Sequence, residues 1–340
     1  QCNVIYANAD QEEVTTEQAF RIADNLSEIG TSIVLLTGGE PFVRKDLTDI
    51  AKYFKSVGIH PRIQTNGLAK PEQIEDLAAS GIHDISISLD SLLPDTQDKV
   101  NGGYNNSWLR AIKAISTVNK YMPDETFASF GCVLAPTNLM HVESVIEFAT
   151  KIGWWVSLVP AHVSTRDAPR SFSSFDVDLR FTPESYPEVK RVLERVVKLK
   201  RDGYNVYDSE EYIKNIYKFV TGEPLDWRRR NGGVCDSPNL YFAIQPNGDM
   251  GVCCDYRLPY SVSTYEDSFP DHYHNRMLRQ DVYDIAKDCS GCMYGSFPEI
   301  TITARYYEAM LQRAATFLVS KKNSQNKGFF RGSVDDFVAL

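Results

Sequence analysis

At 340 residues, the chain is long enough for one large domain, or for one domain with a smaller appendage, and its 43% hydrophobic content allows a sizeable core. The formal net charge of −9 and the pI of about 5.3 argue against a nucleic-acid binder, whose affinity would depend on clusters of Lys and Arg. No apolar run approaches the roughly 18 residues of a membrane span, and no signal peptide is visible, so we expect a cytoplasmic protein.

The N-terminal half alternates regularly between two hydrophobic patterns. Helical spacing predicts helices over residues 15–30, 46–58, 71–81, 107–121 and 141–153. Short apolar runs, typical of a sheet buried on both faces, predict strands over residues 32–37, 61–65, 84–90, 127–135 and 155–161. Such βα units imply a parallel sheet with helices outside, either open or closed into a barrel. In these folds the loops after the strands carry the functional site.

The alternation stops after residue 165. Helical spacing returns over residues 183–202, 209–221 and 304–319. The run WRRR (227–230) is typical of a solvated surface, with anion binding as the alternative. A cysteine-bearing region follows at 235–298, and the segment 320–330 has the polar composition of a mobile tail.

Residues 38–41 read GGEP at the end of the first predicted strand. Gly38 and Gly39 permit close backbone approach, and Pro41 fixes the direction in which the chain leaves. The carboxylate of Glu40 could accept hydrogen bonds from an ammonium group. The alternative is an ordinary strand-to-helix turn that carries an exposed acid.

Two further motifs, IQTNG (63–67) and SISLD (86–90), end the next two predicted strands. Together with GGEP, they resemble the radical S-adenosylmethionine (radical SAM) enzymes. The resemblance implies a partial (β/α)6 barrel in which Gly38, Gly39, Glu40 and Pro41 hold the amino group of S-adenosylmethionine. Other cofactor-binding residues are implied at Thr65, Asn66, Ser88, Asp90 and Asn138. Asn66-Gly67 also has an ordinary explanation, because this pair favours a tight turn.

The resemblance requires a [4Fe–4S] cluster bound by a C-x3-C-x2-C motif after the first strand. Only Cys2 is present there, and only five of the six barrel strands are predicted. We expect the sequence to begin inside the cluster loop, with Cys2 as the third ligand. Two alternatives stay open: Cys2 is the second ligand and Ile5 replaces the third, or Cys2 is an ordinary thiol in a degenerate enzyme.

A second set of cysteines lies near the C-terminus. Cys235 precedes FAIQPNGDMGVC (242–253), which ends in Cys253 and predicts a hairpin with Asn-Gly at its turn. Cys289 and Cys292 form a C-x2-C pair. Four such thiolates suit zinc or an iron–sulfur cluster. The pattern resembles the Twitch domain, a shortened SPASM domain, which implies one auxiliary [4Fe–4S] cluster.

The resemblance implies four parts of the chain. These are a barrel over 1–165, a helical linker over 166–234, a Twitch-like domain with a C-terminal helix over 235–320, and a polar tail over 321–340.

The implied reaction is reductive cleavage of S-adenosylmethionine and abstraction of a hydrogen atom from a substrate carbon. We expect oxidation of a small polar molecule or a peptide residue, with flavodoxin or ferredoxin as electron donor. Cys254 lies outside the four-ligand pattern, so an epimerase with this thiol as hydrogen donor is the alternative, whereas Cys132 is expected in the core. A non-catalytic binding barrel and a zinc-stabilised structural protein also stay open.

The segment after the last predicted strand could meet the substrate. His162, Arg166 and Arg170 could bind carboxylate or phosphate groups there, with a solvated loop as the alternative.

Overall fold

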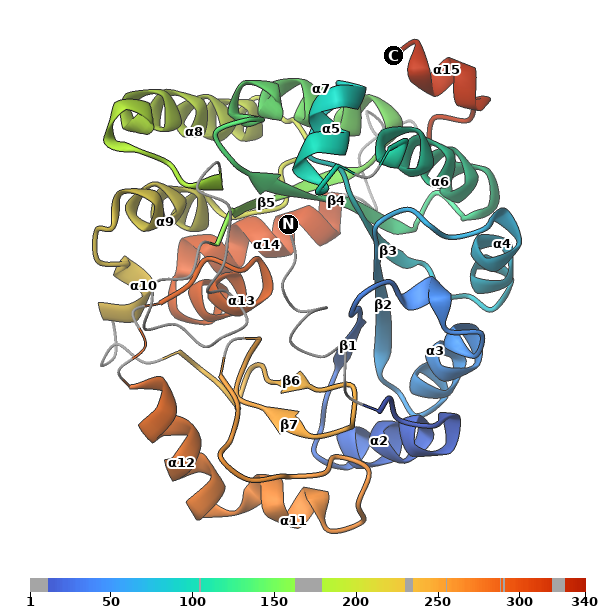
Figure 1. The fold of residues 1–340 in the computed structure, drawn as a ribbon, viewed down its shortest axis with the longest axis vertical. Helices are drawn as coiled ribbons and strands as arrows, with labels where there is room; N and C mark the ends of the chain where they lie inside the picture. Colours follow the sequence, from blue (N-terminus) through green and yellow to red (C-terminus); the bar gives the residue numbers. More distant parts are fainter. Residues whose placement is uncertain are drawn as a thin grey trace.

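Five parallel strands form an arc at the centre of the molecule (Figure 1). This computed structural model describes residues 12–103, 105–162, 179–229, 235–254, 256–287, 289, 291–319 and 328–340. The strands are β1 (Ile33–Leu36), β2 (His60–Thr65), β3 (Asp84–Ser88), β4 (Phe127–Leu134) and β5 (Trp155–Pro160). They pair in sequence order, and every pairing is parallel. The predicted partial barrel of βα units is therefore confirmed.

Helices cover the outer side of the arc. They are α2 (Thr16–Glu28), α3 (Leu47–Ser56), α4 (Pro71–Ala79), α5 (Pro94–Val100), α6 (Ser107–Tyr121) and α7 (Val142–Ile152). The predicted N-terminus of α2 is confirmed, because the side chain of Thr15 accepts from the backbone of Gln18 in a capping box. The short helix α5 was not predicted from the sequence.

The two faces of the sheet differ in polarity. Ile63, Ile85 and Leu158 are almost fully buried in the core formed with the outer helices. The alternate positions carry half-buried polar residues, such as Gln64 and Ser86. The expectation of strands that are apolar on both faces is therefore wrong, because the inner face lines the concave side of the arc.

The second half of the chain is mainly helical. It contains α8 (Tyr186–Arg201), α9 (Glu210–Thr221), α10 (Asp226–Arg229), α11 (Phe269–His274), α12 (Arg276–Ala286), α13 (Ser296–Arg305), α14 (Tyr307–Val319) and α15 (Val334–Val338). The helix predicted over 304–319 is divided, because Tyr306 has an extended backbone between α13 and α14. The predicted hairpin is confirmed as β6 (Ala243–Ile244) and β7 (Met250–Gly251), with Gly248 in the left-handed region at φ +85°.

The hairpin packs on the β1 edge of the sheet, beside α2 (Figure 1). Ile22 of α2 and Phe54 of α3 share a hydrophobic cluster with Met250, Val262 and Phe269. This cluster fixes the cysteine-bearing region against the start of the sheet.

Residues 328–340 correct the expectation of a polar tail. Phe329 is 6% exposed and Phe337, in α15, is 2% exposed, and both belong to the main core. The ring of Phe329 lies 6.4 Å from that of Trp154. Two aromatic side chains therefore anchor this segment in the core.

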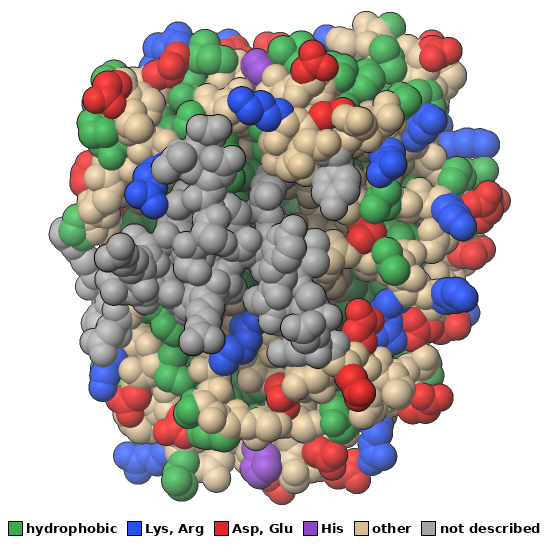
Figure 2. All heavy atoms as spheres, viewed as in Figure 1, with side chains coloured by type: hydrophobic (Ala, Val, Ile, Leu, Met, Phe, Trp, Pro, Cys, Tyr) green, Lys and Arg blue, Asp and Glu red, His purple; other side chains and the backbone are tan. Residues whose placement is uncertain are grey.

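The surface of one face carries acidic and basic side chains intermixed around its rim (Figure 2). Within the described parts of the chain, we find no helix with the length and hydropathy needed to cross a membrane.

Gly67, directly after β2, offers a test of this packing. A Cβ there would lie 3.0 Å from the Cα of Ala111 in α6, and the φ of Gly67 is +90°. Gly67→Ala should lower the free energy of unfolding through both left-handed strain, about 1–2 kcal/mol, and overpacking, about 1–3 kcal/mol. Urea denaturation measures the loss.

Gly203→Ala is the matched control, because Gly203 has a φ of +92° but no atom within 4 Å of the added Cβ. It should lose only the strain contribution. Equal losses in the two variants would contradict the close approach of β2 and α6.

Candidate active site

The carboxylate of Glu40 joins the ends of β1 and β2. Its Oε1 accepts from the hydroxyl of Thr65 at 2.7 Å and from the backbone N–H of Phe42 at 3.1 Å. Its Oε2 accepts from the backbone N–H of Asn66 at 2.8 Å. A carboxylate offers about four acceptor positions, so the hydrogen bonds made within the described residues leave Oε2 with capacity for one further donor.

The glycines before Glu40 leave the backbone accessible. Gly38 and Gly39 are both exposed, and Gly38 has a φ of +137° with nothing within 4 Å of a Cβ placed there. A ligand can therefore approach this backbone closely. Pro41 is buried and begins the short helix η1 (Pro41–Val43), which carries the chain away from the strand end.

The loop after GGEP holds the segment that enters α2. Arg44 pairs with Asp46 at 2.6 Å, and its Nη1 donates to the carbonyl of Val14 at 3.0 Å. The Arg44 guanidinium is the main reason that the pKa of Asp46 is lowered to about 2. The backbone of Val14 also donates to Pro246 in the hairpin turn at 2.8 Å. The N-terminal segment is thus fixed between the GGEP loop and the hairpin.

Thr65 and Asn66 form a turn against the GGEP loop. The hydroxyl oxygen of Thr65 accepts from the N–H of Gly67 at 3.1 Å, and the side-chain carbonyl of Asn66 accepts from the N–H of Leu68 at 3.1 Å. Thr65 is buried, whereas Asn66 is exposed. The tight turn expected for Asn-Gly is present, and the turn is tied to Glu40.

The ends of β3 and β4 are joined by buried side chains. Asp90 and Asn138 both have 0% exposure. The amide nitrogen of Asn138 donates to the carbonyl of Asp90 at 2.9 Å, and the carboxylate of Asp90 accepts from the N–H of Val133 at 2.6 Å. Ser88, at the end of β3, is half-buried. Asp90 and Asn138 therefore fix the ends of β3 and β4, and both side chains lie beneath the accessible edge of the sheet.

The C-terminal cysteines lie in half-buried loops. The sulfur of Cys253 accepts from the N–H of Tyr256 at 3.3 Å, and that of Cys289 accepts from the N–H of Gly291 at 3.4 Å. Burial, with a smaller contribution from neighbouring Cys289, raises the pKa of Cys235 above its ordinary value. Such N–H···S contacts are common at iron–sulfur ligands, where they tune the reduction potential.

The four thiols do not converge on one point. Among the described residues, no three His, Cys, Asp or Glu side chains are grouped closely enough to hold a single metal ion. This arrangement lacks the tetrahedral ligand set of a preformed zinc site. A [4Fe–4S] cluster takes each thiolate on a different iron, so its ligands are spaced more widely.

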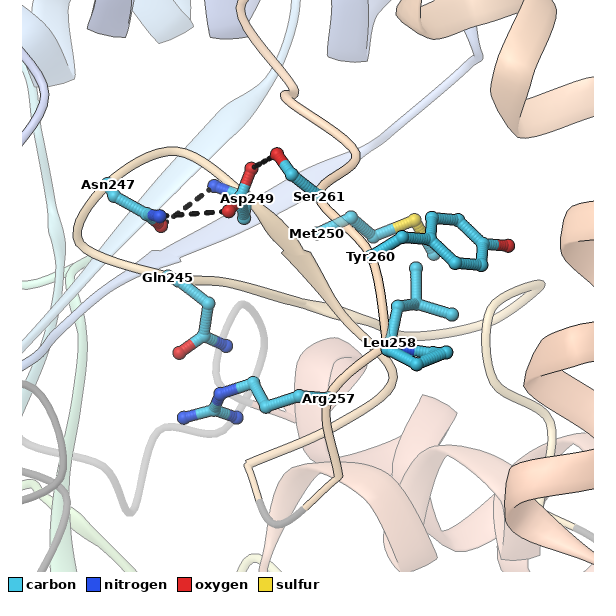
Figure 3. A pocket seen from close by; sticks show the side chains of 9 residues that line it. Gln245, Asn247, Asp249, Met250, Arg257, Leu258, Tyr260 and Ser261 are labelled. Atoms are coloured by element: carbon cyan, nitrogen blue, oxygen red, sulfur yellow. Dashed lines mark hydrogen bonds between the residues drawn. The ribbon is translucent and has the colours of Figure 1, made fainter.

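Cys254 and a small polar pocket share one arginine. Nη1 of Arg257 donates to the carbonyls of Cys253 and Cys254, each at 3.2 Å. Arg257 also lines a pocket of about 280 Å³ on the hairpin, where it lies on the same side as Gln245 (Figure 3). Asp249 in this pocket accepts from the side chains of Asn247 and Ser261.

His162 differs from its prediction. Its ring stacks on Tyr294 with centroids 3.9 Å apart, and its Nε2 accepts from the N–H of Met293 at 2.9 Å. Burial lowers the pKa of His162 to about 4. The neutral imidazole joins the end of β5 to the Cys292 turn, so neither anion binding nor a solvated loop describes it.

A pair of buried carboxyl groups was not predicted from the sequence. Asp208, 1% exposed, accepts from the hydroxyl of Ser157 at 2.8 Å and from the N–H of Leu158 at 2.6 Å. Glu299 in α13, 2% exposed, accepts from the N–H of Ser209 at 2.9 Å. The residues lie far apart in sequence, and no local pattern indicates the pair.

Basic groups surround this carboxyl pair without neutralising it fully. Arg313 approaches Glu299 at 3.8 Å, and its guanidinium lies 3.6 Å from the ring centroid of Tyr207. The ammonium of Lys200 donates to the carbonyl of Val206 at 2.8 Å. Burial raises the pKa of Asp208 to about 6 and that of Glu299 to about 7.

The remaining predictions divide into three groups. Cys2, Arg166 and Arg170 lie outside the described residues. Cys132 has 0% exposure in β4, which confirms its place in the core. The GGEP and Thr65–Asn66 segments lie together at the strand ends, whereas the roles predicted for them and for the C-terminal cysteines stay predictions.

Comparison with known proteins bears on the region that contains the GGEP and Thr65–Asn66 segments. Residues 2–149 match the family model described as the Radical SAM superfamily. Residues 2–149 are therefore similar to a radical SAM domain, as the strand-end motifs predicted. A domain of this superfamily implies S-adenosylmethionine and a [4Fe–4S] cluster.

Two curated relatives and one solved structure are similar to this chain. The AdoMet-dependent heme synthase of Methanosarcina barkeri is 32% identical over 142 residues, which cover 42% of this chain and 40% of that protein. The PqqA peptide cyclase of Bradyrhizobium diazoefficiens is 30% identical over 130 residues, which cover 35% of this chain and 34% of that protein. The chain thus spans less than half the length of these two relatives.

The solved structure is SuiB of Streptococcus suis bound to precursor peptide SuiA. The TM-score is 0.62 at 17% identity, over 98% of this chain and 72% of that chain. At this identity the similarity concerns the fold.

The buried pair of Asp208 and Glu299 should make the stability of the folded protein depend on pH. Because the pKa values of Asp208 and Glu299 are raised above their ordinary values, the folded protein binds more protons than the unfolded chain. Their stabilising contribution is full at low pH and is lost as pH rises through about 6 to 7. The thermal midpoint, followed from about pH 5 to pH 8, should therefore fall less steeply in Asp208→Asn and Glu299→Gln.

Glu143→Gln is the control, because Glu143 pairs with Arg195 on the surface. It should leave the pH slope of the wild type unchanged. Identical slopes in all four proteins would show that the buried carboxyls do not titrate in this range.

Proposed function

We propose that the protein cleaves S-adenosylmethionine reductively and removes a hydrogen atom from a peptide residue, with net oxidation of that residue. The observation that carries this proposal is the carboxylate of Glu40. It is fixed by β1 and β2 at the accessible edge of the sheet, and its hydrogen bonds to described residues leave one acceptor position.

The residues around Glu40 have separate tasks in this proposal. Glu40 accepts from the ammonium of S-adenosylmethionine, and the backbone of Gly38 and Gly39 lies against the methionine portion. Ser88 lines the same edge as a polar contact. Asp90 and Asn138 are positioning residues, because their full burial places them behind this edge. A rigid set of donors and acceptors orients the cofactor and lowers the entropic cost of reaction.

The first iron–sulfur cluster would be held by a loop that includes Cys2. Bound there, it supplies the electron that divides S-adenosylmethionine into methionine and a 5′-deoxyadenosyl radical. Arg44 and the hairpin turn fix Val14, so the chain that leads from this loop enters α2 beside the GGEP segment.

An auxiliary [4Fe–4S] cluster would be held by Cys235, Cys253, Cys289 and Cys292. The N–H donors to two of these sulfurs favour thiolate ligands, as at iron–sulfur clusters. Bound there, the cluster would accept the electron that the substrate loses when it is oxidised.

A peptide is the substrate class that we favour. One relative is named a peptide cyclase, and SuiB, which has a similar fold, was solved with a precursor peptide. The polar residues on the inner face of the arc, such as Gln64 and Ser86, suit backbone amides.

Epimerisation of a peptide residue is the second candidate, because Cys254 is a half-buried thiol outside the four-ligand set. A thiol donor would return solvent hydrogen to the substrate carbon. Deuterium from D2O at that carbon would identify epimerisation, whereas a product that has lost two hydrogens would identify oxidation.

Glu40→Gln tests the cofactor site. It retains an oxygen acceptor for Thr65 but loses the negative charge toward the ammonium. A charge-assisted hydrogen bond contributes roughly 1.5–3 kcal/mol, so the Kd for S-adenosylmethionine should rise about 10- to 150-fold. Isothermal titration with the anaerobically reconstituted protein measures the Kd.

Two controls separate the charge from the fold. Asp49→Asn removes an exposed acid from α3 and should leave the Kd unchanged. Thr65→Val removes one hydrogen bond to Glu40 while the charge remains, so its effect should be smaller. A Kd for Glu40→Gln equal to that of the wild type would show that Glu40 serves only the turn.

A further inference from the structure

Arg228 is buried, although its sequence context favours the surface. It belongs to the run WRRR and lies in the short helix α10. The residue is only 9% exposed, and the preceding Trp227 is fully buried. Burial of an arginine is costly unless its charge is compensated, so the surroundings of this guanidinium decide its role.

The aliphatic part of Arg228 packs on the Cys289–Cys292 turn. A Cβ on Gly291 would lie 2.6 Å from Cδ of Arg228 and 2.8 Å from Cδ1 of Leu225. Gly291 has a φ of +101°, and its N–H donates to the sulfur of Cys289 at 3.4 Å. The turn therefore requires glycine at this position, and the absence of a side chain there lets Arg228 pack against the turn.

The guanidinium retains an unused donor. Nη1 of Arg228 is buried and has no hydrogen-bond partner within the described part of the chain. Of the described acids close to Arg228 in sequence, Asp236 lies 2.9 Å from Arg305 and Asp226 pairs with Lys218. An anionic group beside the turn would complete this arrangement.

The thiols supply the anion. Arg228 packs on the turn that carries Cys289 and Cys292, and both cysteines would bind a cluster as thiolates. A [4Fe–4S] cluster with four thiolate ligands has a net negative charge, which increases by one when the cluster accepts an electron. A buried cation stabilises the reduced form more than the oxidised form.

We propose that Arg228 supplies buried positive charge to an iron–sulfur cluster held by Cys235 and the Cys289–Cys292 turn, and thereby raises its reduction potential. This inference rests on the auxiliary cluster proposed above. Arg228 is a positioning and tuning residue, because it acts on the cluster and not on the substrate.

The test uses the full chain with Cys2→Ala, which removes the predicted ligand of the first cluster. After anaerobic reconstitution, iron and sulfide content establish whether the second cluster is present. A redox titration with dithionite, followed by electron paramagnetic resonance, then gives its potential. Arg228→Gln should retain iron but show an about tenfold lower ratio of reduced to oxidised cluster at a fixed potential, which is a shift of ~59 mV to lower potential.

Two variants serve as controls. Arg228→Lys retains the charge and should restore most of the wild-type potential. Arg195→Gln removes an exposed arginine of α8 and should change nothing. If Arg228→Gln loses its iron, retention of iron in Arg228→Lys would still support charge compensation, whereas loss in both variants would show that Arg228 serves only packing.

Two results would overturn the inference in different ways. An intact cluster with the same potential in Arg228→Gln would leave the auxiliary cluster in place and refute the role of Arg228. Absence of iron and sulfide from the Cys2→Ala background would refute the auxiliary cluster itself, and the role of Arg228 with it.

Discussion

The carboxylate of Glu40 is the interaction on which the rest of the site depends. It converts two adjacent strand ends into one rigid edge, because its oxygens accept from Thr65 and Asn66 after β2 while its backbone belongs to the exit from β1. Parallel strands bring their carboxyl ends to the same edge of a sheet. Asp90 and Asn138, which are buried, join the ends of β3 and β4 by hydrogen bonds in the same way.

The C-terminal half completes the arc as well as carrying the cysteines. The hairpin fixes the segment that enters α2, and His162 joins the end of β5 to the Cys292 turn. The buried pair of Asp208 and Glu299 connects β5 to α13. The region that carries the C-terminal cysteines is therefore attached to both edges of the sheet.

Local patterns were sufficient to predict the sheet and the GGEP edge, because apolar runs locate strands and glycines mark their ends. They could not predict the burial of Arg228, since a charged run reads as surface unless its three-dimensional neighbours are known. The carboxyl pair of Asp208 and Glu299, and the anchoring of Phe329, likewise depend on contacts between distant segments. Hydrophobic periodicity identifies the buried face of a helix or strand, but it does not identify the distant side chains that pack against that face.

The central claim is that this edge holds S-adenosylmethionine for reductive cleavage. The most direct measurement is the formation of 5′-deoxyadenosine when the anaerobically reconstituted protein is mixed with S-adenosylmethionine and dithionite. We expect wild-type protein to form it, with an equal amount of methionine. If the protein contains its iron–sulfur cluster and binds S-adenosylmethionine, yet forms no 5′-deoxyadenosine, the site does not cleave the cofactor.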